Sequence, residues 1–111
     1  QKTYLAVVRG RPTQERFSVD APLGRDPSSR INLKMGRIEL SDGGQDALTE
    51  FRVLGHRRSR EHGALALVEC RPKTGRQHQI RVHLALQGLP ILGDKLYGVD
   101  EETALSFFER T

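Results

Sequence analysis

The densest group of side chains that could do chemistry runs from Arg71 to His83, in the segment RPKTGRQHQIRVH. Arg71, Lys73 and Arg76 surround the point where a strand is expected to give way to a helix. Exposed backbone amides and the helix dipole make such a junction a natural anion site. The phosphate of an RNA backbone would fit there. The alternative is a solvated basic face, and the residue types leave both interpretations open.

Arg81 is the second candidate, within the predicted helix. Gln77 and His78 precede it at helical spacing and so share its face, whereas Ile80 and Leu84 are expected to point towards the core. A partly buried arginine needs an anionic partner, because an unpaired buried charge is very costly. No carboxylate lies at helical spacing along this segment. The partner must therefore come from elsewhere in the fold or from a ligand.

Two other residues have reactive side chains, and for both a structural role is favoured. Asp94 follows Gly93 in the glycine-rich run after the helix, where it could cap a turn or hold a nearby cation. Cys70 is the only cysteine, so no disulfide can form within the chain, which fits a reducing cytosol. It ends an apolar run, which indicates a small core residue rather than a nucleophile.

These candidates must be positioned by a small, basic domain. The chain has 111 residues, a net charge of +4 and only four lysines among its 18 Lys and Arg residues. Arginine suits phosphate and base recognition, so nucleic acid is a candidate partner. No long apolar stretch or signal peptide is present, which predicts no membrane association and a cytoplasmic location. The abrupt start at Gln1 and end at Thr111 predict a fold truncated at both ends.

Alternating and β-branched residues predict strands at 3–8, 17–21, 34–40, 48–54 and 65–70. The polar connection at 56–63 predicts that the last two form an antiparallel hairpin, and 23–33 is expected to be a loop. Thr74 and Gln77 match a capping box, which predicts a helix over 77–87 that ends at a left-handed Gly88. A second helix is predicted over 101–109. Several strands and few helices indicate an α+β domain built on a mostly antiparallel sheet.

The run TGRQHQIRVHLALQGLPILGDKLYG, at 74–98, closely resembles the signature of RluA-type RNA pseudouridine synthases, of the RluA/RsuA superfamily. The segment KTYLAVVRG at 2–10 looks like the tyrosine segment of that family, and 20–24 and 47–54 also fit. The resemblance covers nearly the whole chain in the correct order. It implies a pseudouridine synthase-like fold with a mixed, mostly antiparallel sheet.

The resemblance implies that uridine in structured RNA is converted to pseudouridine with no cofactor and no metal. Arg81 would pair with the catalytic aspartate and orient it. Tyr4, which on its own reads as a strand core residue, would stack on the target uracil and could accept a proton late in the reaction. His78 and Gln79 would shape the pocket or bind the RNA backbone. Ribosomal RNA is the expected substrate, transfer RNA the alternative, and the intact enzyme is expected to be a monomer.

RNA contacts are further expected at Arg71, Lys73 and Arg76. The catalytic aspartate of the family lies in a His-Arg-Leu-Asp segment before the tyrosine strand, and nothing in this sequence matches it. The closing strand of the family is expected after Thr111. Residues 1–111 are therefore predicted to be a partial catalytic domain that is inactive alone. The alternatives are a non-catalytic basic RNA-binding module and a structural or interaction domain with a basic surface.

Overall fold

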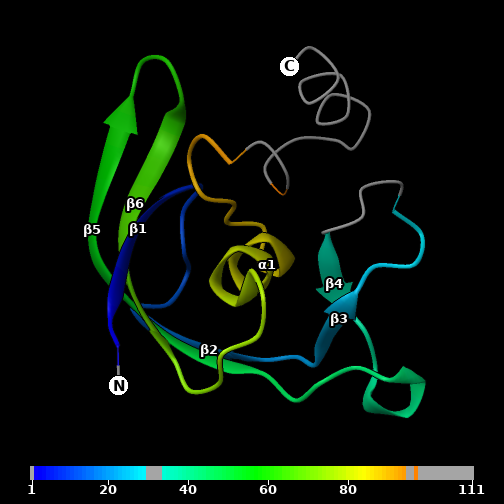
Figure 1. The fold of residues 1–111 in the computed structure, drawn as a ribbon. Helices are drawn as coiled ribbons and strands as arrows, with labels where there is room; N and C mark the ends of the chain where they lie inside the picture. Colours follow the sequence, from blue (N-terminus) through cyan, green and yellow to red (C-terminus); the bar gives the residue numbers. More distant parts are fainter. Residues whose placement is uncertain (1, 30–33, 95–96, 98–111) are drawn as a thin grey trace.

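The computed structural model describes residues 2–29, 34–94 and 97. Its main element is an antiparallel sheet with the strand order β1-β6-β5-β2 (Figure 1). The four strands are β1 (Tyr4–Arg9), β2 (Arg16–Asp20), β5 (Leu48–Ser59) and β6 (Gly63–Pro72). The strands predicted in these regions and the antiparallel β5–β6 hairpin are confirmed. The helix predicted over 101–109 lies outside the described residues.

The β5–β6 hairpin is longer than the sequence predicted. Its strands continue through most of the polar segment 56–63, with pairs such as Arg57↔Leu65 and Ser59↔Gly63, so the turn itself covers only 60–62. The far part of the hairpin projects beyond the rest of the sheet in Figure 1. A β-bulge between Val53 and Gly55 separates this projecting part from the part that carries the core.

A second, two-stranded sheet consists of β3 (Leu23–Arg25) and β4 (Met35–Arg37). The loop prediction for 23–33 is therefore wrong at its start, because Leu23 is fully buried and pairs with both Arg37 and Gln45. The strand predicted at 34–40 is shorter than expected. It ends before the 3-10 turn η1 (Leu40–Asp42), in which the left-handed Gly43 donates its N–H to the carbonyl of Leu40.

One helix, α1 (Gln79–Leu86), lies between the main sheet and the β3–β4 pair (Figure 1). Leu84 is fully buried and Ile80 packs against the same core as Phe51 and Val68, as predicted. On the opposite side of the helix, Val82 packs with Leu23 and Ala47 in a second apolar cluster. Helix α1 thus closes two small cores at once, and this fixes its position relative to the sheet.

The C-terminal end of α1 lies where the sequence predicts it, but the N-terminal end does not. Gly88 adopts φ 72°, and Gly88 and Leu89 donate their N–H groups to Ala85 and Leu84, which is the Schellman arrangement. The helix begins at Gln79 instead of residue 77, after His78 in a left-handed conformation with φ 56°. The predicted capping box does not form, because the Thr74 hydroxyl is engaged by other partners.

The sheet face that α1 covers carries the main core, which includes Cys70. This side chain is fully buried, and burial, with a smaller contribution from the charge of Glu69, raises the pKa of its thiol to about 12. The interpretation of Cys70 as a core residue is confirmed. On the opposite face of the sheet, four apolar side chains are at least 38% exposed, namely Leu5, Val7, Leu54 and Leu67. The described residues therefore do not cover this face.

Candidate active site

A cavity of about 340 Å³ opens where β1 starts and α1 begins. It brings together residues that are far apart in the sequence: Tyr4 from β1 and Arg81 from α1 line the same cavity. The rest of the lining is Pro72, Thr74, Gly75, Arg76, His78, Gln79 and Ile80. Tyr4 is 45% exposed, so its ring is not part of the core. Five of the seven residues predicted to form the site thus surround one hollow.

Gln79 holds the wall of this cavity in place. Its carboxamide oxygen accepts hydrogen bonds from the Thr74 hydroxyl and the Arg76 N–H, and its NH₂ group donates to the Leu48 carbonyl and the Thr49 hydroxyl. The side chain is 4% exposed. Gln79 therefore shapes the pocket from inside the protein, and its amide groups are occupied by the chain itself.

The hydrogen bonds continue from Gln79 into the core. Thr49 Oγ1 lies 2.7 Å from His83 Nδ1, and His83 Nε2 lies 3.0 Å from the Ala21 carbonyl. A carbonyl only accepts, so Nε2 carries the proton and Nδ1 accepts one from Thr49. Burial lowers the pKa of His83, which keeps the ring neutral. This chain of hydrogen bonds ties β5, α1 and Ala21, the residue that follows β2, together.

Arg81 meets its anionic partner in Asp94, thirteen residues later. Nε and Nη2 of Arg81 donate to the two carboxylate oxygens of Asp94 at 3.0 and 2.9 Å. The hydrogen bond to Asp94 is the largest effect that raises the pKa of Arg81, so the guanidinium stays charged. The prediction that the partner comes from outside the helix is confirmed. Both roles suggested for Asp94 are observed, because its carboxylate holds the Arg81 cation and also accepts the N–H of Tyr97 in the turn that follows.

Tyr97 packs against this ion pair. Its ring centroid lies 4.9 Å from Cζ of Arg81, and its backbone N–H donates to Asp94. Its hydroxyl accepts the N–H of Met35 and lies 2.7 Å from Nδ1 of His78. Burial, with the charge of Arg81 as the second effect, lowers the pKa of His78, so the neutral ring can accept a hydrogen bond from the Tyr97 hydroxyl. Burial also raises the pKa of Tyr97.

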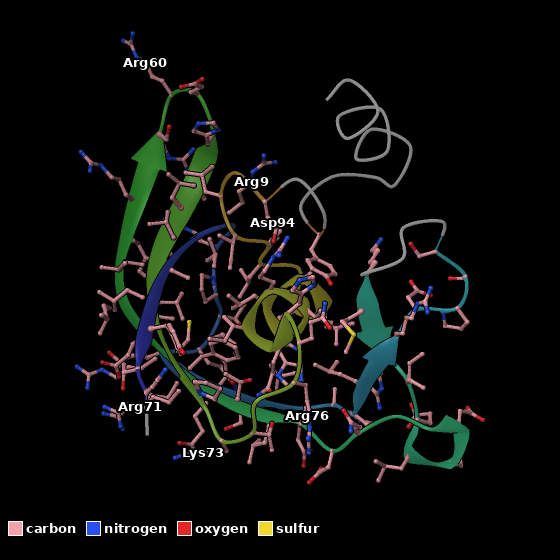
Figure 2. All side chains as sticks on the ribbon, in the orientation of Figure 1. Arg9, Arg60, Arg71, Lys73, Arg76 and Asp94 are labelled. Atoms are coloured by element: carbon pink, nitrogen blue, oxygen red, sulfur yellow. The ribbon has the colours of Figure 1, made fainter. Side chains whose placement is uncertain are left out.

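The predicted cations lie at different places around the site. Arg76 lines the cavity, and its Nε donates to the carbonyl of Asp46. Lys73 forms an ion pair of 3.1 Å with Glu50. Arg71 pairs with Glu69 and lines a separate hollow of about 300 Å³ on the sheet face that α1 does not cover. In the view of Figure 2 the three cations follow the lower edge of the molecule, and Asp94 lies beyond α1 from them.

The sequence did not identify three residues that build the site. The sequence pattern presents Thr49 only as a strand residue and His83 only as the end of the basic segment. A polar pair inside apolar strand and helix patterns is nevertheless a usable signal for a buried hydrogen bond. Tyr97 was noted only within the family signature. Among the described ranges no group of three or more His, Cys, Asp or Glu side chains could hold a metal ion. No helix in the described part is long and apolar enough to cross a membrane.

Comparison with known proteins identifies the family of this chain. Residues 1–86 match the family model described as RNA pseudouridylate synthase. The chain is 42% identical over 98 residues to "Uncharacterized RNA pseudouridine synthase YhcT" of Bacillus subtilis, covering 88% of this chain and 30% of that protein. It is 44% identical over 97 residues to "Ribosomal large subunit pseudouridine synthase D" of Xanthomonas campestris, covering 87% of this chain and 26% of that protein.

The solved structure of "Human RNA Pseudouridylate Synthase Domain Containing 1" superimposes with a TM-score of 0.78 at 30% identity, over 87% of this chain and 40% of that one. The chain therefore spans less than half the length of each relative named here. The predicted α+β class with a mostly antiparallel sheet is confirmed by the strand pairing and by this neighbour. The chain belongs to the RNA pseudouridylate synthase family, and its resemblance to the RluA-type members is confirmed.

Proposed function

We propose that residues 1–111 form part of the catalytic domain of an RNA pseudouridine synthase, which isomerises uridine to pseudouridine in structured RNA. The observation that carries this proposal is the cavity in which Tyr4 of the tyrosine segment and Arg81 of the helix signature meet. Large-subunit ribosomal RNA is the first choice of substrate, because "Ribosomal large subunit pseudouridine synthase D" proteins are among the relatives. Transfer RNA is the alternative.

The proposed reaction needs a carboxylate that this sequence does not supply in the expected context. In the complete protein, an aspartate from another segment acts on the sugar or the base, and the bond between C1′ of the ribose and N1 of uracil breaks. The uracil rotates and its C5 bonds to C1′, after which the proton on C5 leaves. Arg81 orients the aspartate and keeps it anionic through charge-assisted hydrogen bonds. The ring of Tyr4 stacks on the flipped uracil and its hydroxyl is placed to receive a proton.

The predicted cations would hold the RNA backbone, Arg76 from the cavity wall and Lys73 and Arg71 from outside the cavity. Arg71 pairs with Glu69, whose side chain is 19% exposed, whereas Lys73 is in an exposed ion pair with Glu50. Exchange of such a surface carboxylate for a phosphate costs little, because exposed pairs contribute about 0–1 kcal/mol. Arg76 and His78 are nearer to the flipped base, on the cavity wall itself. The proposal includes a monomeric, cytoplasmic enzyme that needs no metal or cofactor.

The test uses the complete protein that contains this sequence and a uridine-containing ribosomal RNA transcript, with pseudouridine measured by nucleoside chromatography. We expect Arg81→Ala to abolish turnover and to leave RNA binding within about threefold of wild type. Arg60→Ala is the matched control, because Arg60 is exposed in the turn between β5 and β6 and does not line the cavity. Wild-type turnover by Arg81→Ala would refute the role assigned to this residue.

A second arm tests the extent of the catalytic domain. We expect the isolated 111-residue chain to form no pseudouridine, because the reaction needs an aspartate from elsewhere. Pseudouridine formation by the isolated chain would contradict the assignment as a partial domain. RNA binding without any turnover by the complete protein would instead support a non-catalytic RNA-binding module.

A further inference from the structure

The ion pair between Arg81 and Asp94 uses only one edge of the guanidinium. A guanidinium has two edges that can each take a carboxylate, one formed by Nε and Nη2 and the other by Nη1 and Nη2. Asp94 occupies the first edge, with its two oxygens on Nε and Nη2. Within the described residues no hydrogen bond reaches Nη1. The second edge is therefore available, on a side chain that lines the cavity with Tyr4.

Asp94 is built as a fixed anchor. Its side chain is 3% exposed, and its backbone N–H donates to the carbonyl of Ile91. The segment before it is bound along the free edge of β1 by an Ile91↔Val8 bridge and by a hydrogen bond from the Leu92 N–H to the Val7 carbonyl. The strand that presents Tyr4 thus also holds the segment that leads to Asp94. One strand thus positions both Tyr4 and the segment that carries the partner of Arg81.

Tyr97 restricts the remaining freedom of Arg81. Its ring lies against the guanidinium, and its hydroxyl is held by the backbone of Met35 and by His78. A planar group that is bound along one edge and stacked on one face has a fixed orientation. Arg81 itself is half-exposed at 36%, so a second carboxylate could reach its free edge without displacing the first.

We propose that Asp94 is a positioning residue, and that one guanidinium holds two carboxylates in the working enzyme: Asp94 on the Nε–Nη2 edge and the catalytic aspartate on the Nη1–Nη2 edge. This inference rests on the proposed function, which supplies the second carboxylate. Asp94 touches neither substrate nor reacting atoms. It acts through Arg81, by fixing the plane in which the catalytic aspartate is bound.

The experiment compares Asp94→Ala, Asp94→Asn and Asp94→Glu in the complete protein with Asp42→Ala, whose residue is exposed on η1, as the matched control. We expect Asp94→Ala to lower kcat by about 10- to 100-fold, the usual effect of losing a group that orients a catalytic side chain, and to change KM by less than about threefold. Asp94→Asn retains the shape of the side chain and one acceptor, and we expect it to fold and to show an intermediate loss. Asp94→Glu should recover part of the rate.

A pH profile distinguishes positioning from a merely structural role. The charge of Asp94 lies across the guanidinium from the catalytic aspartate, and a nearby like charge raises the pKa of a carboxyl group. In Asp94→Asn the acid limb of kcat/KM should move to lower pH, by about 0.4–1.7 units for charges about 7 Å apart. A folded Asp94→Asn variant with wild-type kcat and an unmoved acid limb would overturn the inference. Absence of pseudouridine in the wild-type reaction would instead overturn the proposed function.

Discussion

Replacing Thr49 by valine tests the buried hydrogen-bond chain beneath the cavity. Thr49 is fully buried, accepts a hydrogen bond from the Gln79 amide and donates one to Nδ1 of His83. Valine has nearly the same shape, so the variant removes the hydroxyl without leaving a cavity. Nδ1 of His83 is then an acceptor without a donor, and the NH₂ group of Gln79 keeps only its bond to the Leu48 carbonyl.

The expected loss follows from these two groups. A buried polar group that loses its partner costs about 1–3 kcal/mol, and the added methyl recovers about 1 kcal/mol by burial. We therefore expect Thr49→Val to lower the free energy of unfolding by about 1–5 kcal/mol, against the about 5–15 kcal/mol typical of a small domain. Burial keeps His83 neutral, so no compensating charge can form at neutral pH.

The measurement is urea denaturation of the 111-residue chain, followed by circular dichroism and extrapolated linearly to zero denaturant. Thr13→Val is the matched control, because Thr13 is exposed and its replacement should change stability by less than about 0.5 kcal/mol. A Thr49→Val variant as stable as the control, with an unchanged m-value, would refute the reasoning. It would mean that the observed hydrogen bonds contribute nothing net to folding.

Three more predictions concern stability. The pKa of His83 in the folded chain lies below its ordinary value of 6.5, so the unfolded chain takes up the extra proton at a higher pH than the folded chain does. The free energy of unfolding should therefore fall as the pH drops below about 6.5, and above that pH it should not depend on His83. Urea titrations over a pH series would measure this. Leu84→Ala should cost about 2–5 kcal/mol by the same measurement, because Leu84 is fully buried in the main core; a loss under about 1 kcal/mol would contradict that placement. Gly88→Ala should cost about 1–2 kcal/mol, because φ is 72° there and no heavy atom lies within 4 Å of the added methyl group, so the cost is conformational alone. An unchanged thermal midpoint for Gly88→Ala would argue against the left-handed end of α1.

The sequence predicted the elements that bury a continuous apolar pattern. Ile80 and Leu84 mark the core face of α1, and the alternation of Phe51 and Val53 with charged neighbours marks β5. The sequence pattern was misleading where both faces of a strand are polar. The segment from His56 to Ser59 has no apolar alternation, because this part of the hairpin projects beyond the core, and backbone pairing alone keeps it extended.

The start of α1 and the partner of Arg81 could not be predicted for a different reason. Thr74 and Gln77 have the spacing of a capping box, but the Thr74 hydroxyl accepts the N–H of Leu48 and donates to Gln79. Asp94 reaches Arg81 only because the segment before it lies along β1. Such contacts depend on the packing of distant segments, and local sequence patterns carry no information about them.

The sealed position of Cys70 has a practical consequence. A thiol with a pKa of about 12 and no exposed surface is almost entirely un-ionised at neutral pH, and the thiolate is the species that reacts with alkylating reagents. Because the chain has a single cysteine, each labelling event reports one opening of the sheet beneath α1. The native sequence thus contains its own conformational probe, and mass spectrometry of alkylated protein could follow how RNA binding suppresses these openings.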